Sequence, residues 1–279
     1  MLAAKTTAEG VAMGMHPSRR RGTGMEFSQY RSYQPGDDLR SLDWKMFARS
    51  DRYYVRESET ETSIAISLLL DASASMNHED EGISKMQFAK YVVASLAYLG
   101  VKQGDAVGLY IFQQGQLFSL PSQKQPQHLT RLIHELEQVK AGGRFTEPVH
   151  YRNLFLGKRR RELLVFVTDF YQQHQEISQM LDLMSSLKHE IIVLQVMAGN
   201  ELELKFDGYS ELEDLETHRT ISINTGEARL AYQKRLTAHL SQIRNELLDK
   251  NIFYTLMKMT EPIDSTVRDF LLRRDRGLR

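Results

Sequence analysis

Residues 68–93 read LLLDASASMNHEDEGISKMQFAKYVV, and this stretch decides the fold class. A continuous apolar run from Ile64 to Leu70 is typical of a buried strand, and the spacing of apolar residues from Ser84 to about Leu99 predicts an amphipathic helix. The next apolar run, AVGLYIF at 106–112, predicts a second strand. The order strand, helix, strand indicates a βαβ unit with two parallel strands.

The rest of the chain continues this alternation. Helices are expected at 126–139, 174–187, after Asn224 and at 264–273, and strands at ELLVFVTDF (162–170), EIIVLQV (190–196) and IFYTLM (252–257). The segment FQQGQLFSL (112–120) predicts an antiparallel hairpin because Gly115 separates two apolar runs. The sequence therefore predicts an α/β fold, with a mainly parallel sheet, helices on both faces and an antiparallel edge hairpin.

Two parts of the chain differ from this pattern. Residues 1–60 are rich in Arg, Asp and Tyr and have few apolar runs, so we expect an extended N-terminal arm before a single domain at 61–279. Within that domain, the acidic stretch ELELKFDGYSELEDLETHRT (201–220) interrupts the alternation. It predicts an excursion on the surface at about 199–223.

Composition limits the classes of function. The chain has 279 residues, and its 36 basic and 36 acidic side chains cancel, so no global field favours nucleic acid as a partner. Cysteine is absent, which leaves oxygen and imidazole as metal ligands. The sequence holds neither an apolar signal-peptide core nor about 20 consecutive apolar residues. We expect a cytoplasmic protein without direct membrane insertion.

Polar residues gather where two predicted strands end. Asp71, Ser73 and Ser75 follow the first core strand, and Asp169 ends the strand VFVT. The carboxyl ends of parallel strands form the crevice where ligands bind. One reading is a polar turn that caps the next helix, although Ser84 and Gln87 already form a capping box there. The other is a site for a hard cation, because Mg²⁺ takes about six oxygen ligands.

Two motifs resemble known families. The pattern D-x-S-x-S after an apolar strand, with a later strand ending in T-D, resembles the metal-ion-dependent adhesion site of von Willebrand factor A (vWA) domains. The stretch GTGMEFSQYRSYQPGDDLRSLDWKMFARSDRYYVRE (22–57) resembles the signature that precedes such a domain in the bacterial family called domain of unknown function 58, DUF58. The similarity continues to the C-terminus and implies a vWA-like fold.

The resemblance also implies site residues and partners. Its metal ligands would be Asp71, Ser73, Ser75, Thr146 and Asp169, holding Mg²⁺ with Mn²⁺ or Ca²⁺ as alternatives. Thr146 departs from the family pattern, since Arg144 and Phe145 separate it from Gly143. A protein partner would place an acidic side chain on the metal. The family context implies a non-enzymatic adaptor or co-chaperone of a MoxR-type AAA+ ATPase. The protein partner would be this ATPase or a client protein of the ATPase.

Two other functions remain open at this point. A metal-dependent phosphatase also begins with an Asp at a strand end, but Ser73 stands where that class has its acid, and a serine is no general acid at neutral pH. A scaffold with an empty metal site is the third possibility. The acidic segment 201–217 would then be its docking surface.

Overall fold

The structure is a computed structural model. It describes residues 21–22, 26–35, 37–38, 42–59, 65–113, 116–145, 151–152, 155–156, 161–204, 209–217 and 219–277. The chain divides into two compact units, one formed by Met15–Ser63 and the other containing Ile64–Arg279. The smaller unit overlaps the expected arm at 1–60, and the larger unit overlaps the expected domain at 61–279.

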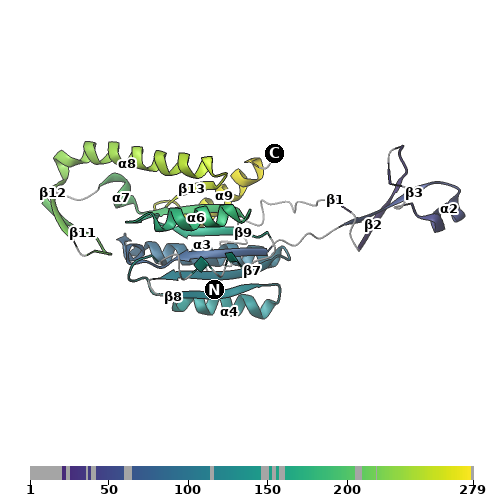
Figure 1. Ribbon diagram of the computed structural model, residues 1–279, viewed down its shortest axis with the longest axis horizontal. Coiled ribbons are helices and arrows are strands. Elements are labelled where there is room, and N and C mark those ends of the chain that lie inside the picture. The colour runs from purple at the N-terminus through teal and green to yellow at the C-terminus, as the bar shows by residue number, and fades with distance from the viewer. Residues whose placement is uncertain are drawn as a thin grey trace. The chain divides into compact units, whose positions relative to one another are not determined.

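A six-stranded sheet forms the centre of the larger unit, in the spatial order β13-β10-β9-β4-β7-β8 (Figure 1). The strands are β4 (Ala65–Asp71), β7 (Ala106–Gln113), β8 (Gln116–Gln123), β9 (Leu163–Thr168), β10 (Glu190–Met197) and β13 (Phe253–Lys258). All neighbouring pairs are parallel except β7 and β8, which are antiparallel. This arrangement confirms the predicted mainly parallel sheet with an antiparallel edge hairpin.

Helices cover both faces of this sheet. They are α3 (Lys85–Lys102), α4 (Pro126–Gln138), α6 (Glu176–Ser186), α7 (Gly199–Glu203), α8 (Thr225–Asp249) and α9 (Ile263–Gly277). Helix α3 contacts α4, α9 and the central strands, whereas Met180 of α6 and Ile243 of α8 pack into the core cluster that contains Leu69. Successive side chains of a strand point to opposite faces, so Leu68 and Leu70 face away from that cluster.

Short elements complete the larger unit. They are the 3₁₀ helix η2 (Ala74–Asn77) and two antiparallel hairpins, β5 (Glu79–Asp80) with β6 (Ile83–Ser84) and β11 (Tyr209–Glu213) with β12 (Thr220–Asn224). Ser84 caps α3, because its hydroxyl accepts a hydrogen bond from Gln87 N at 3.1 Å. The expected acidic excursion contains α7 and the β11–β12 hairpin.

Buried apolar strands explain why this sheet forms. All six side chains of β9 are buried, as a parallel strand covered on both faces requires. One edge of the sheet is β8, whose pairing with β7 shifts register between Val107 and Leu109. The exposed Pro121 lies in the facing part of β8. Regular pairing is therefore interrupted near that end of the edge strand, between the pairs Val107–Gln123 and Leu109–Leu120.

Gly108 in β7 lies too close to β8 for any larger side chain. A Cβ there would lie 2.7 Å from Ser122 N and 2.8 Å from Leu120 O, both backbone atoms. We expect Gly108→Ala to lower the free energy of unfolding by about 1–3 kcal/mol in a urea titration.

Gly142→Ala is the control for this substitution, because its Cβ would come no closer than 3.6 Å to another residue. It should change the free energy of unfolding by less than about 0.5 kcal/mol. Equal effects of the two substitutions would contradict the close contact.

The smaller unit is more regular than the expected extended arm. Strand β3 (Tyr54–Glu59) pairs antiparallel with both β1 (Arg21–Gly22) and β2 (Glu26–Ser32), and α2 spans Trp44–Ser50. Asp43 caps α2, since its Oδ1 accepts hydrogen bonds from Lys45 N at 2.9 Å and Met46 N at 3.1 Å. The arm therefore carries a small sheet and a helix.

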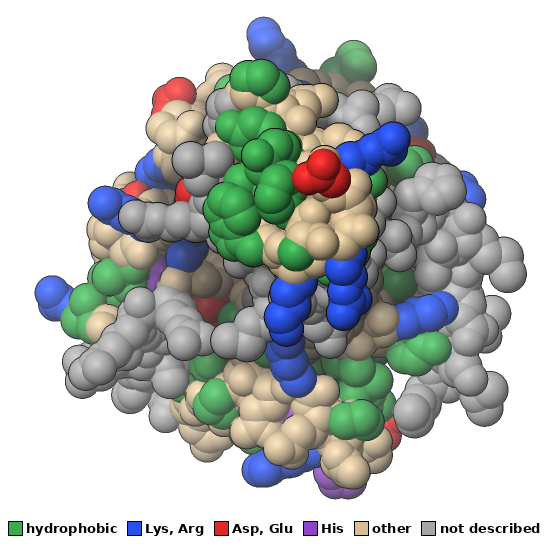
Figure 2. Space-filling view, turned by 90° about the vertical axis from the view of Figure 1, so that its right-hand side faces the viewer, with side chains coloured by type: hydrophobic (Ala, Val, Ile, Leu, Met, Phe, Trp, Pro, Cys, Tyr) green, Lys and Arg blue, Asp and Glu red, His purple; other side chains and the backbone are tan. Residues whose placement is uncertain are grey.

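Aromatic side chains are exposed on this smaller unit. Trp44 is 61% exposed and Tyr53 is 50% exposed, and Phe47 stacks on Tyr53 with ring centroids 4.5 Å apart. The space-filling view shows a group of hydrophobic side chains close to Lys and Arg side chains (Figure 2).

Candidate metal site

The predicted site lies where two central strands end side by side. Strands β4 and β9 are parallel neighbours, and their register pairs Leu70 with Val167. Thr168, the last residue of β9, donates a hydrogen bond from Oγ1 to Asp71 Oδ2 at 2.6 Å. The chain reaches β9 after building β7 and β8 on the other side of β4. This reversal of direction places the site at a topological switch point, where open α/β sheets bind their ligands.

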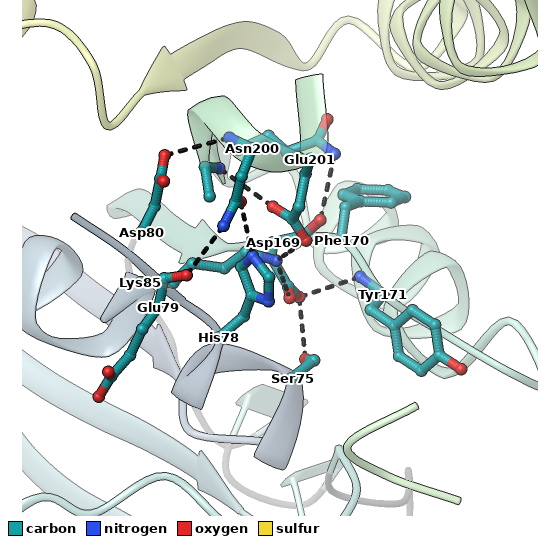
Figure 3. A network of polar contacts seen from close by, with 12 residues as sticks. Ser75, His78, Glu79, Asp80, Lys85, Asp169, Phe170, Tyr171, Asn200 and Glu201 are labelled. Atoms are coloured by element: carbon teal, nitrogen blue, oxygen red, sulfur yellow. Dashed lines mark hydrogen bonds and ion pairs between the residues drawn. The ribbon is translucent and has the colours of Figure 1, made fainter. Parts of the chain in front are cut away.

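The structure brings four of the predicted ligands together. Ser73 N donates to Asp71 Oδ1 at 2.9 Å, and the hydroxyls of Ser73 and Ser75 lie 3.0 Å apart. Ser75 Oγ donates in turn to Asp169 Oδ1 at 3.2 Å (Figure 3). Asp71 and Ser73 are completely buried. The fifth predicted ligand, Thr146, lies outside the described residues.

The oxygen spacing in this group fits a magnesium ion. Neighbouring ligands of an octahedral ion with bonds of about 2.1 Å lie about 3.0 Å apart. Ser73 Oγ lies 3.0 Å from Ser75 Oγ, and Ser75 Oγ lies 3.2 Å from Asp169 Oδ1. These are hydrogen-bond distances, and they are also close to that edge. Among the described residues, no group of three or more His, Asp or Glu side chains could hold a metal. Hydroxyls would therefore have to supply part of the ligand set.

Asp71 organises the loop from within the core. Both of its oxygens already accept hydrogen bonds from the protein, one from Ser73 N and one from Thr168 Oγ1. Burial, together with the negative charge of Asp169, raises the pKa of Asp71 to about 7 against the lowering effect of these hydrogen bonds. A positive charge at the site would stabilise the ionised form of this carboxyl group.

A buried lysine, which the sequence analysis missed, holds Asp169 from the other side. Lys85 Nζ donates to Asp169 Oδ2 at 3.0 Å and to Glu201 Oε1 at 2.6 Å (Figure 3). Its side chain is only 5% exposed. Burial lowers the pKa of Lys85, but the two carboxylates more than offset this and raise it. Asp169 therefore offers Oδ1 to Ser75 while Oδ2 is bound to the ammonium group.

The residues that surround Asp169 and Lys85 come from distant elements. Gln195 of β10 donates to Asp169 O at 3.1 Å and accepts from Tyr254 OH of β13 at 2.7 Å. Glu201 accepts from Ala198 N at 3.0 Å through Oε2. One sequence signal could have found Glu201: it is an acid only four residues after the end of β10, at the same edge of the sheet as Asp169.

A pocket of about 310 Å³ opens beside these residues. Its lining includes Ser75, Lys85, Asp169, Glu201, Asp214 and His239. Because Ser75 and Asp169 line it, a side chain that enters this pocket reaches the serine and aspartate oxygens of the site.

A family model described as "Protein of unknown function DUF58" matches residues 29–242. The chain belongs to the DUF58 family. Uncharacterized protein Rv1480 of Mycobacterium tuberculosis is 29% identical over 220 residues, which are 77% of this chain and 68% of that protein. Uncharacterized protein YeaD of Bacillus subtilis is 34% identical over 107 residues, 38% of this chain and 24% of that protein. The DUF58 match begins within the arm, at residue 29, and includes the site residues from Asp71 to Asp169.

Among the solved structures similar to this DUF58 chain, one shares its fold. An aerotolerance-related membrane protein from Bacteroides fragilis has a TM-score of 0.51 and 17% identity, and the match covers 77% of this chain and all of that one. The VWA domain of SpRpn10 has a TM-score of 0.44 and 10% identity, and the match covers 74% and 94% of the two chains. None of the described helices has the length and apolar character needed to cross a membrane.

Proposed function

We propose that this DUF58 protein is a non-enzymatic, metal-dependent protein-binding module. Ser73, Ser75 and Asp169 hold a divalent cation, with Mg²⁺ as the principal ion, and Asp71 orients the loop and balances the charge. A carboxylate of a partner protein completes the coordination. The observation that carries this proposal is that three side-chain oxygens lie next to one another. Ser75 Oγ lies 3.0 Å from Ser73 Oγ and 3.2 Å from Asp169 Oδ1.

The electrostatics of the site support a cation. Two carboxylates, Asp71 and Asp169, lie in the same buried group, and the negative charge of Asp169 raises the pKa of Asp71. Lys85 supplies one positive charge, but it is shared with Glu201. Asp71, Asp169 and Glu201 carry three negative charges against the one positive charge of Lys85, so a divalent ion would neutralise the two that remain. An acidic side chain of a partner would then bind to an open coordination position of the ion.

The partner that we propose is a MoxR-type AAA+ ATPase or its client, which the family resemblance implies. Binding rather than hydrolysis is the proposed role of the metal. The residue two positions after Asp71 is Ser73, and its hydroxyl lies 3.0 Å from that of Ser75. In this proposal Ser73 is a metal ligand. A serine cannot act as the general acid of an aspartyl-phosphate enzyme.

Calorimetric titration with Mg²⁺ and with Mn²⁺ tests the proposal. We expect Ser75→Ala to weaken metal binding by at least about tenfold, because it removes one ligand, and Asp71→Ala/Ser73→Ala to abolish it. The matched control is Ser186→Ala, since Ser186 is exposed at the end of α6.

Capture of a purified MoxR-type ATPase should be unchanged for Ser186→Ala, weaker for Ser75→Ala and absent for Asp71→Ala/Ser73→Ala. A chelator should abolish the capture by the wild type. If the wild-type protein binds neither ion at millimolar concentration, the metal-dependent function is wrong and the empty scaffold replaces it.

A further inference from the structure

A second pocket, of about 640 Å³, lies between α3 and α4. Pockets for small molecules typically enclose about 300–1,000 Å³ and combine apolar walls with a few polar groups. The apolar walls of this pocket come from both helices and from the segment after α4: Met86, Tyr91, Ala94, Ile133, Leu136, Val139 and Ala141. Its volume and its lining therefore match those of a small-molecule site.

One lysine holds the two helices together at this pocket. Lys90 of α3 donates from Nζ to Glu137 O at 3.0 Å and to Val139 O at 2.5 Å, at the C-terminal end of α4. A lysine that binds these last carbonyl groups stabilises the end of the helix. Because Lys90 belongs to α3, it also fixes the spacing of α3 and α4. The pocket is therefore a preformed part of the fold.

One end of the pocket lies beside the loop that carries the proposed metal ligands. Asn77 and Ala141 both line the pocket, and Asn77 Nδ2 donates to Ala141 O at 3.0 Å. Two residues after Ala141, Gly143 O accepts a hydrogen bond from Ala74 N at 2.8 Å, and Ala74 directly follows Ser73. Hydrogen bonds thus order this end of the pocket. None of the four described ligands of the proposed metal site is among its lining residues.

The charged groups around the pocket favour an anionic ligand. Lys90 and Lys140 line it, and Glu137 is the one acid among its described lining residues. An ammonium group has three N–H donors, and the two carbonyl groups accept only two from Lys90. Burial lowers the pKa of Lys90, and the charge of Glu137 opposes this effect. An anion beside Lys90 would accept the third N–H and stabilise the charged form.

We propose that this pocket binds a small organic anion, such as a carboxylate with an apolar body. The body packs against the apolar side chains of α3 and α4, and the anionic group pairs with Lys90 and Lys140. A molecule with the same body and a positive charge lacks these ion pairs, so it binds more weakly. The site is independent of the proposed metal-dependent function, because the two sites share no described residue.

Decanoate and decyltrimethylammonium test this inference, since the two ions have similar alkyl chains and opposite charges. Isothermal titration calorimetry of the full chain measures the Kd of each ion below the concentration at which it forms micelles. EDTA in the buffer removes divalent ions to which a carboxylate could bind elsewhere. We expect decanoate to bind at least about tenfold more tightly than decyltrimethylammonium.

Two variants locate the binding site. Lys140→Gln should raise the Kd for decanoate by about threefold, because it removes one of the two cations. Ala94→Leu should raise this Kd further, because the larger side chain fills part of the pocket that Ala94 lines. The matched control is Lys124→Gln, since Lys124 is exposed and does not line the pocket, and it should leave the Kd unchanged. Circular dichroism of each variant verifies folding.

Three results would overturn the proposal. Absence of decanoate binding at millimolar concentration would refute the site itself. Equal Kd values for the two amphiphiles would refute an anion as the ligand, and equal effects of Lys140→Gln and Lys124→Gln would refute the location. Because these titrations contain EDTA, none of the results bears on the metal-dependent function.

Discussion

Replacing Lys85 by methionine should lower the free energy of unfolding by about 3–5 kcal/mol, because it leaves buried carboxylates without their cation. The ammonium group contacts Asp169 at 3.0 Å and Glu201 at 2.6 Å, and the side chain of Asp169 is only 2% exposed. Methionine fills a similar volume, so the loss is mainly electrostatic. Urea unfolding in a buffer that contains EDTA measures the effect without any contribution from metal.

Lys102→Met is the matched control, since Lys102 lies on the same helix and is exposed. It should change the free energy of unfolding by less than about 0.5 kcal/mol. A second comparison is with Mg²⁺ present. If the ion binds beside Asp169, it should recover part of the stability of Lys85→Met. A loss no larger than that of the control would show that Lys85 is not the counter-ion of the site.

The metal-free protein should become more stable as the pH falls from about 7.5 to about 5, by roughly 2–3 kcal/mol. Burial raises the pKa of Asp71 from 3.8 to about 7. Between these values the folded state binds a proton that the unfolded state does not, so the free energy of unfolding increases as the pH decreases. Mg²⁺ would replace the proton at neutral pH, and the pH dependence should become flatter.

Urea titrations at several pH values, with EDTA or with Mg²⁺, measure this dependence. Asp71→Asn is the control, because an amide cannot titrate, and its slope in EDTA should be smaller than that of the wild type. Glu216, whose pKa is also raised, contributes in the same direction. Identical slopes for the wild type and for Asp71→Asn would exclude Asp71 as the titrating group.

Much of the fold could be predicted because apolar runs are local signals. The six side chains of β9 are all buried, and the run LLVFVT that encodes them is visible in the sequence. The arm was harder to predict, because α2 has only seven residues and none of them is buried. Its capping residue, Asp43, is the signal that could have indicated a helix.

The candidate site could be predicted only in part. Asp71, Ser73, Ser75 and Asp169 follow strand ends, and the rule for parallel sheets brings such positions together. Lys85 directly follows a capping serine and is separated from Glu201 by 116 residues, so no spacing pattern connects them. Glu216 is equally remote from the strand ends, in a hairpin that a hydrogen bond from Tyr171 to Asp214 connects with the loop after β9.

The register shift and Pro121 at the β8 edge have a further consequence for behaviour at high concentration. An outermost strand with free N–H and C=O groups is a template on which another copy can add a strand. Proline has no N–H to offer, and an irregular edge gives a poor match to a straight incoming strand. The β8 side of the sheet is thereby protected against strand addition, and self-association into fibrous aggregates is disfavoured at that border.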